Sequence, residues 1–123
     1  MIIPKTLTEA KVMLEEKMLE TLHILESKTG RPMPIPTIRF ERLGQTLGYA
    51  NERNEIVINS DTINAKFWEG TINRTLPHEV CHHVAPLIYN KWVHGFDKNN
   101  GWSHGNAWKE CMRMIGLPPD RCV

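Results

Sequence analysis

The sequence predicts a single α+β domain over residues 1–123, with three helices and a small three-stranded antiparallel sheet. Three observations predict this fold class. Apolar residues recur at helical spacing over residues 6–29, three short strand-like segments lie between residues 37 and 59, and two further helical stretches follow. A length of 123 residues is also near the common size of one domain.

The first element is an amphipathic helix over residues 6–29. Thr6 and Glu9 have the spacing of a capping box, in which Thr6 caps the helix and Glu9 reaches back. Gly30 suits the left-handed residue that ends a helix, and Pro32 prevents continuation. The stripe expected to face the core consists of Leu7, Ala10, Leu14, Met18, Leu22 and Leu25.

Three short strands are expected after the proline-rich connector at residues 31–36. Residues 37–41 alternate between polar and apolar, residues 47–50 form a weaker second strand, and residues 55–59 form the clearest one. Short turns separate these segments, so an antiparallel meander is expected.

A second helix is predicted over residues 64–85, with Phe67 among the residues of its apolar side. Pro77 cannot donate a hydrogen bond to the carbonyl of Asn73, so it should kink the helix. The kink either aims the residues after it or is a tolerated accident. Pro86 should end the helix or bend it again.

Residues 89–102 are predicted to form a loop, and the last helix should begin at residue 103 or 104 and run to about residue 115. Gly116 and the prolines after it mark its end.

The central motif is His78-Glu79-Val80-Cys81-His82, an HExxH pattern. On a helix His78 and His82 are about 40° apart, so both imidazoles can bind one metal ion. Glu79 lies about 60° from His82 and can reach a water on that ion without being a ligand. This is the pattern of a zinc peptidase, whereas the alternative is a surface helix with ordinary histidines.

A catalytic zinc site needs a third protein ligand and an open position for water. The pattern HExxHxxGxxH fails, because Ala85 and Ile88 stand where glycine and histidine are needed. Glu110 is a possible carboxylate ligand, but no recognisable motif surrounds it. His104 is preferred, because the 21 intervening residues span the distance easily and Gly105 leaves room for close approach.

Other side chains compete for roles at this site. His83 points about 100° away from His82 on the helix, and His94 lies in the predicted loop. The expected chemistry uses Zn²⁺ to activate a water and polarise a carbonyl, with Glu79 as the general base. Tyr89, His94 and Arg113 are candidates for a further transition-state donor.

Composition limits the remaining possibilities. A hydrophobic fraction of 41% and a charged fraction of 24% are ordinary for a soluble domain. A net charge of +1 does not indicate the strongly basic surface that is typical of nucleic-acid-binding proteins. Three cysteines argue against a disulfide framework, so Cys81 and Cys111 are expected in the core. No signal peptide or membrane-length segment is seen, so we expect a cytoplasmic protein without a membrane partner.

These motifs resemble the SprT-like metallopeptidases, which include Spartan. The resemblance rests on residues 76–82, on His104-Gly105-Asn106-Ala107-Trp108-Lys109 and on residues 112–116, with weaker matches at residues 48–50 and 56–60. It implies a zincin-like fold and a zinc protease with ligands His78, His82 and His104 and base Glu79. Family members act on DNA-bound proteins, and many carry a C-terminal zinc ribbon. We expect no such ribbon here, because only Cys122 follows the last helix.

The resemblance therefore implies a protein or peptide substrate and suggests DNA as a partner. Trp92 and Trp102 flank a loop with Lys91 and Lys98, which could stack on bases and meet phosphates. The alternative is that these tryptophans anchor the loop on the core. A second function class also stays open, a zinc-stabilised module that binds protein or DNA without catalysis.

Overall fold

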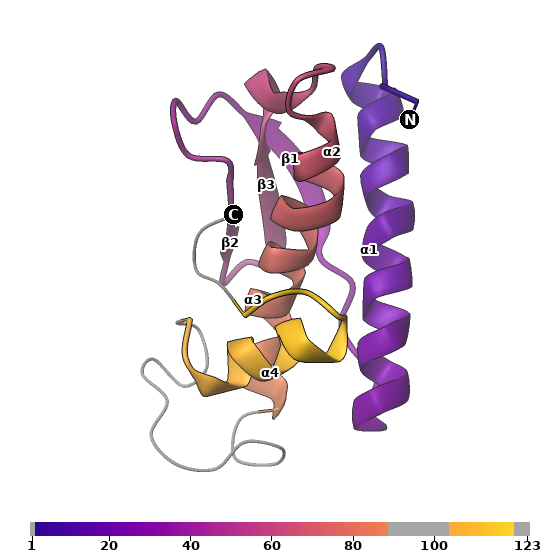
Figure 1. The fold of residues 1–123 in the computed structure, drawn as a ribbon, viewed down its shortest axis with the longest axis vertical. Coiled ribbons are helices and arrows are strands. Elements are labelled where there is room, and N and C mark those ends of the chain that lie inside the picture. Colours follow the sequence, from indigo (N-terminus) through magenta and orange to yellow (C-terminus); the bar gives the residue numbers. More distant parts are fainter. Residues whose placement is uncertain (1, 89–103, 120–123) are drawn as a thin grey trace.

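The computed structural model describes residues 2–88 and 104–119, and its elements confirm the α+β class (Figure 1). The predicted loop at residues 89–102 lies outside the described residues. The elements in chain order are α1 (Leu7–Thr29), β1 (Thr37–Glu41), β2 (Gly48–Asn51), β3 (Glu55–Asn59), the 3₁₀ turn η1 (Ser60–Thr62), α2 (Trp68–Gly70), the π turn η2 (Thr71–Thr75), α3 (Leu76–Ile88) and α4 (Asn106–Met114).

Helix α1 begins and ends as predicted. The Glu9 backbone N–H donates to Thr6 Oγ1 at 3.1 Å, and the Glu9 carboxylate accepts a bond from the Lys5 backbone N–H at 3.4 Å. Gly30 adopts a φ of 70° and its N–H donates to the Glu26 carbonyl. A left-handed residue costs glycine little, so Gly30 can close the helix without strain.

The predicted apolar stripe of α1 is buried except for Leu7, which is 46% exposed. Leu7 is the first residue of the helix, and the buried part of the stripe starts one turn later. The buried members are Ala10, Leu14, Met18, Leu22 and Leu25.

The three strands form a mixed sheet in the order β1-β3-β2, so the predicted antiparallel meander is wrong for β1. Strands β2 and β3 are antiparallel, with Asn51 opposite Glu55, as their short turn requires. Strand β1 runs parallel to β3, with Thr37 opposite Glu55. The reason is that residues 42–47 cross from β1 to the far side of the position of β3. Strand β3 therefore lies between β1 and β2.

Asn59 at the end of β3 holds this crossing segment. Its side chain is 2% exposed, and its Nδ2 donates to the carbonyls of Gly44 and Thr46, both at 2.9 Å. Its Oδ1 accepts bonds from the backbone N–H groups of Leu43 and Asp61. One buried amide therefore satisfies four backbone groups that the crossing and the following turn would leave unpaired.

The predicted helix over residues 64–85 is observed as the continuous stretch α2–η2–α3, over residues 68–88. Asn64 lies just before its start, and its side chain accepts a bond from the Phe67 N–H at 3.0 Å. Phe67 was expected on the apolar side but is 43% exposed, because the helix starts one residue later and Trp68 takes the buried position.

The kink expected at Pro77 takes the form of the π turn directly before it. The Leu76 N–H donates to the Thr71 carbonyl five residues earlier, which widens the helix just ahead of the residue that has no N–H. Pro86 does not end the helix, because α3 continues to Ile88. Arg31 Nη1 donates to the Leu87 carbonyl at 2.6 Å and so satisfies one group at that end.

Helix α3 is the centre of the packing. It contacts α1, β2, β3 and α4, and Figure 1 shows α1 beside it and α4 across its end. Every residue from 76 to 85 is buried, so the HExxH motif lies on a core helix and not on a surface helix. No helix among the described residues is long and apolar enough to cross a membrane.

Candidate metal centre

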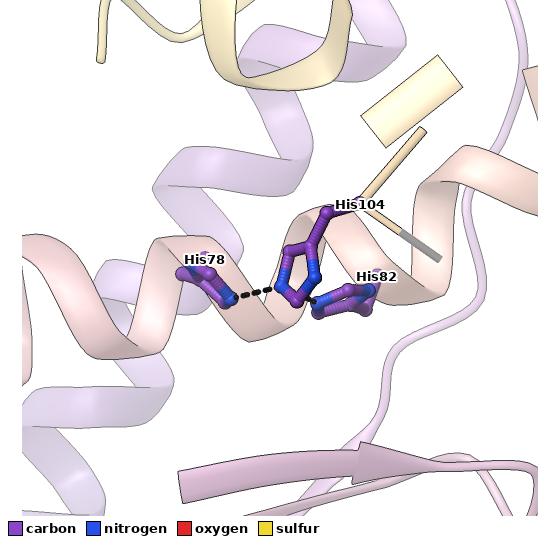
Figure 2. Close-up of side chains that lie close together, drawn as sticks. All are labelled: His78, His82 and His104. Carbon is purple, nitrogen blue, oxygen red and sulfur yellow. Dashed lines mark hydrogen bonds between the residues drawn. The ribbon is translucent and has the colours of Figure 1, made fainter. Parts of the chain in front are cut away.

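Helix α3 places His78 and His82 one turn apart, and His104 reaches them from the segment that precedes α4 (Figure 2). The Nε2 atom of His104 lies 3.0 Å from the Nε2 atoms of both His78 and His82. The three nitrogens thus converge on one point, although one of the rings is more than twenty residues away in the chain.

This convergence fits a cation better than hydrogen bonding alone. A ring nitrogen carries either one hydrogen or one lone pair, so His104 Nε2 cannot form two linear hydrogen bonds at once. Zn–N bonds of 2.0–2.1 Å in a tetrahedral site would separate the ligand nitrogens by about 3.3 Å. The observed 3.0 Å contacts are close to that separation. The three histidines could therefore hold a metal ion.

His78 is suited to act as a neutral donor. Burial, together with the nearby His104, lowers the pKa of His78 to about 4 from an ordinary 6.5. Its imidazole is therefore uncharged at neutral pH, which is the form that offers a lone pair to a metal.

Glu79 lies beside this group and is 5% exposed. Its Oε2 is 3.9 Å from His78 Nε2. Burial raises the pKa of its carboxyl to about 8 when no cation is present, because the charged form loses solvation. A nearby cation would lower the pKa of Glu79 again. The charge of this carboxylate therefore depends on whether a metal ion is bound to the histidines.

The start of α4 positions His104. Gly105 is the N-cap residue, and its carbonyl accepts a bond from the Lys109 N–H at 3.0 Å. The helix ends in a Schellman motif, in which Gly116 has a φ of 79°. The backbone N–H of Gly116 donates to the Arg113 carbonyl, and that of Leu117 donates to the Met112 carbonyl. The predicted last helix is thus confirmed, with a start at Asn106, two or three residues later than expected.

Trp108 contacts all three histidines, a role that the sequence did not indicate beyond its place on the apolar face. Its ring centroid is 4.8 Å from that of His78, 5.7 Å from that of His82 and 4.7 Å from that of His104. Its indole N–H donates to the His78 carbonyl at 3.2 Å. The available signal was its position four residues after His104, which would put both on one side of the last helix if that helix began at residue 104, as predicted.

The competing candidates lie elsewhere. His83 Nε2 contacts the Glu55 carbonyl at 2.9 Å, which ties α3 to β3. Glu110 accepts a bond from Arg113 Nη1 at 3.3 Å on the surface, and it is not part of the histidine group. The candidates in the predicted loop lie outside the described residues, and they are Tyr89, Lys91, Trp92, His94, Lys98 and Trp102.

Cys81 and Cys111 are buried free thiols, as expected of core residues. Burial raises the pKa of Cys81, and a side-chain hydrogen bond with Cys111 adds to this effect. The contact joins α3 to α4, so the helix that carries His78 and His82 is packed against the helix that follows His104.

The comparisons with known proteins agree with this geometry. The model of the SprT-like family matches residues 15–122. The chain is also 28% identical over 106 residues to Protein SprT of Pseudomonas syringae pv. tomato (strain ATCC BAA-871 / DC3000), which covers 85% of this chain and 60% of that protein. The chain thus spans less than two thirds of the length of this curated relative. No solved structure matches. On the strength of the family match over most of its length, the chain belongs to the SprT-like family.

Proposed function

We propose that this protein is a zinc-dependent endopeptidase that hydrolyses peptide bonds. The observation that carries the proposal is the convergence of three Nε2 atoms beside the buried carboxylate of Glu79. The family match and the SprT relative support the same assignment.

His78, His82 and His104 are the proposed metal ligands. Three neutral nitrogen donors suit zinc, and three protein ligands are the number that a catalytic zinc site uses while it keeps one position open. When bound, Zn²⁺ supplies a Lewis acid that polarises a carbonyl and lowers the pKa of its water to about 7.

Glu79 is the proposed general base. Its Oε2 accepts a proton from the attacking water and delivers it to the leaving amine. Burial keeps bulk water away from this carboxylate, so the proton passes between the reacting groups and not to solvent. Trp108 holds His78 by the bond to its backbone carbonyl and limits rotation of all three rings.

The substrate class is a protein or peptide, and DNA-associated proteins are the proposed targets on the basis of the family resemblance alone. A zinc-stabilised binding module is the alternative. Glu79 favours catalysis, because a purely structural metal site has no need for a buried carboxylate 3.9 Å from a ligand nitrogen.

The test measures metal content and cleavage on the same samples. Zinc-loaded protein should cleave an unfolded protein or a DNA-bound protein, and a chelator should stop it. Glu79→Gln should keep its zinc and lose cleavage. Zinc binding by the unmodified protein without hydrolysis of either substrate would leave the binding module as the function.

The third ligand is tested separately. His104→Ala should lower the zinc content well below one ion per chain. Unchanged zinc content would exclude His104 as a ligand and would favour His94 or Asp97, both in the predicted loop.

A further inference from the structure

A pocket of about 220 Å³ opens beside the π turn that precedes the HExxH motif. Its walls come from Leu47, just before β2, and from the helical residues Thr71 and Thr75. The exposed ring of Phe67 lines it as well. The walls are therefore largely apolar, while the pocket stays open to solvent.

Two cations, Lys66 and Arg74, line the same pocket, and both are exposed. Neither has an acidic partner among the residues that the structure describes, whereas Arg39, Arg42 and Arg113 each do. Lys66 Nζ lies 5.1 Å from the centroid of the Phe67 ring, which holds its charge near the pocket. Both charged side chains among the described residues that line the pocket are thus positive.

The pocket is aligned with the metal centre. Thr71, Thr75, His78 and His82 are spaced by four, three and four residues, so they form one stripe of the continuous helix. The helical rise of about 1.5 Å per residue places the pocket walls roughly 5–10 Å from His78 along the axis. An extended peptide rises about 3.3 Å per residue, so this distance corresponds to two or three substrate residues.

The size of the pocket narrows the class of ligand. Pockets for drug-sized ligands have volumes of roughly 300–1,000 Å³, so about 220 Å³ suits a single side chain better than a nucleotide. Apolar walls with cations beside them fit a side chain that has a methylene stem and a negative end.

We propose that this pocket is a substrate subsite that selects an acidic side chain, above all glutamate, two or three residues from the scissile bond. Lys66 and Arg74 are the specificity-determining residues. This inference rests on the proposed peptidase function. It specifies the charge of the preferred substrate residue and the distance of that residue from the scissile bond.

The test compares peptides that differ only by Glu or Gln at each position around one scissile bond. Zinc-loaded protein should cleave the Glu peptide with a kcat/KM about fivefold to tenfold higher at one position, two or three residues from the bond. Arg74→Gln and Lys66→Gln should each lower this ratio, and the double variant should bring it to about 1. Lys11→Glu on α1 alters the net charge at an exposed site elsewhere and should keep the ratio.

A binding measurement separates failure of the subsite from failure of the peptidase. The zinc-loaded Glu79→Gln protein should bind the labelled Glu peptide more tightly than the Gln peptide, and Arg74→Gln in that background should remove the difference. If no peptide is cleaved but this difference is found, the peptidase proposal fails and the preference of the pocket for an acidic side chain stands.

Two results would overturn the pocket proposal. One is equal kcat/KM and equal affinity for Glu and Gln at every position. The other is a Glu preference that survives the Lys66→Gln, Arg74→Gln double variant while the affinity for a single-stranded oligonucleotide falls, which would assign the two cations to phosphate.

Discussion

Replacement of Glu79 by Gln should make the metal-free protein more stable, and the gain should grow with pH. Burial raises the pKa of Glu79 to about 8, against an ordinary 4.5. Between these two values the folded state keeps a proton that the unfolded state has lost. The free energy of unfolding therefore falls as the pH rises through this window.

The size of the effect follows from the shift. Each pKa unit is worth about 1.36 kcal/mol, so the buried carboxyl should cost below 1 kcal/mol at pH 5 and on the order of 4 kcal/mol at pH 8. Glutamine has a similar shape and no charge, so Glu79→Gln removes this pH-dependent cost. The buried His78 titrates in both proteins, and its contribution cancels in the difference between them.

The assay is urea denaturation of both proteins at pH 5 and pH 8 after removal of metal with a chelator. Glu16→Gln, on the exposed surface of α1, is the matched control and should show no such dependence. A stability gap between Glu79→Gln and the unmodified protein that is the same at both pH values would refute the reasoning from burial.

Three further substitutions test the packing around the site. Gly48→Ala should cost about 1–3 kcal/mol in thermal denaturation, because its Cβ would lie 2.9 Å from the Val57 carbonyl oxygen, whereas Gly70→Ala meets no atom within 4 Å and should be neutral or stabilising. Asn59→Ala should lower the free energy of unfolding by about 2–4 kcal/mol, since it removes the four hydrogen bonds that a buried amide makes to the backbone, and a smaller loss would mean that water replaces the amide. Trp108→Phe keeps a ring but removes the donor to the His78 carbonyl, so zinc affinity in a competition assay should fall about tenfold. Unchanged affinity would show that this bond does not position His78.

Local features of this protein were predictable because they depend on neighbours in the chain. The Thr6 cap, the Gly30 end of α1 and the Gly116 end of α4 each require only a few consecutive residues. The shared face of His78 and His82 follows from helical geometry alone. For the same reason the existence and type of the main helices and strands were predicted well.

Errors arose where distant segments decide the outcome. No local signal shows that β3 inserts between β1 and β2, so the parallel pairing of β1 was missed. The burial of Phe67 was also predicted wrongly, because helical periodicity does not tell which residue begins the helix when Trp68 can fill the same space in the core.

The sequence by itself determined the chemistry of the candidate site, since the types and spacing of His78, Glu79 and His82 restrict what the helix can bind or transfer. Only the tertiary structure decided how His104 meets them, how deeply Glu79 is buried, and that Trp108 lies against all three rings. The physical reason is that convergence and desolvation arise from packing between α3 and α4, which are distant in the chain and are brought together by their shared core.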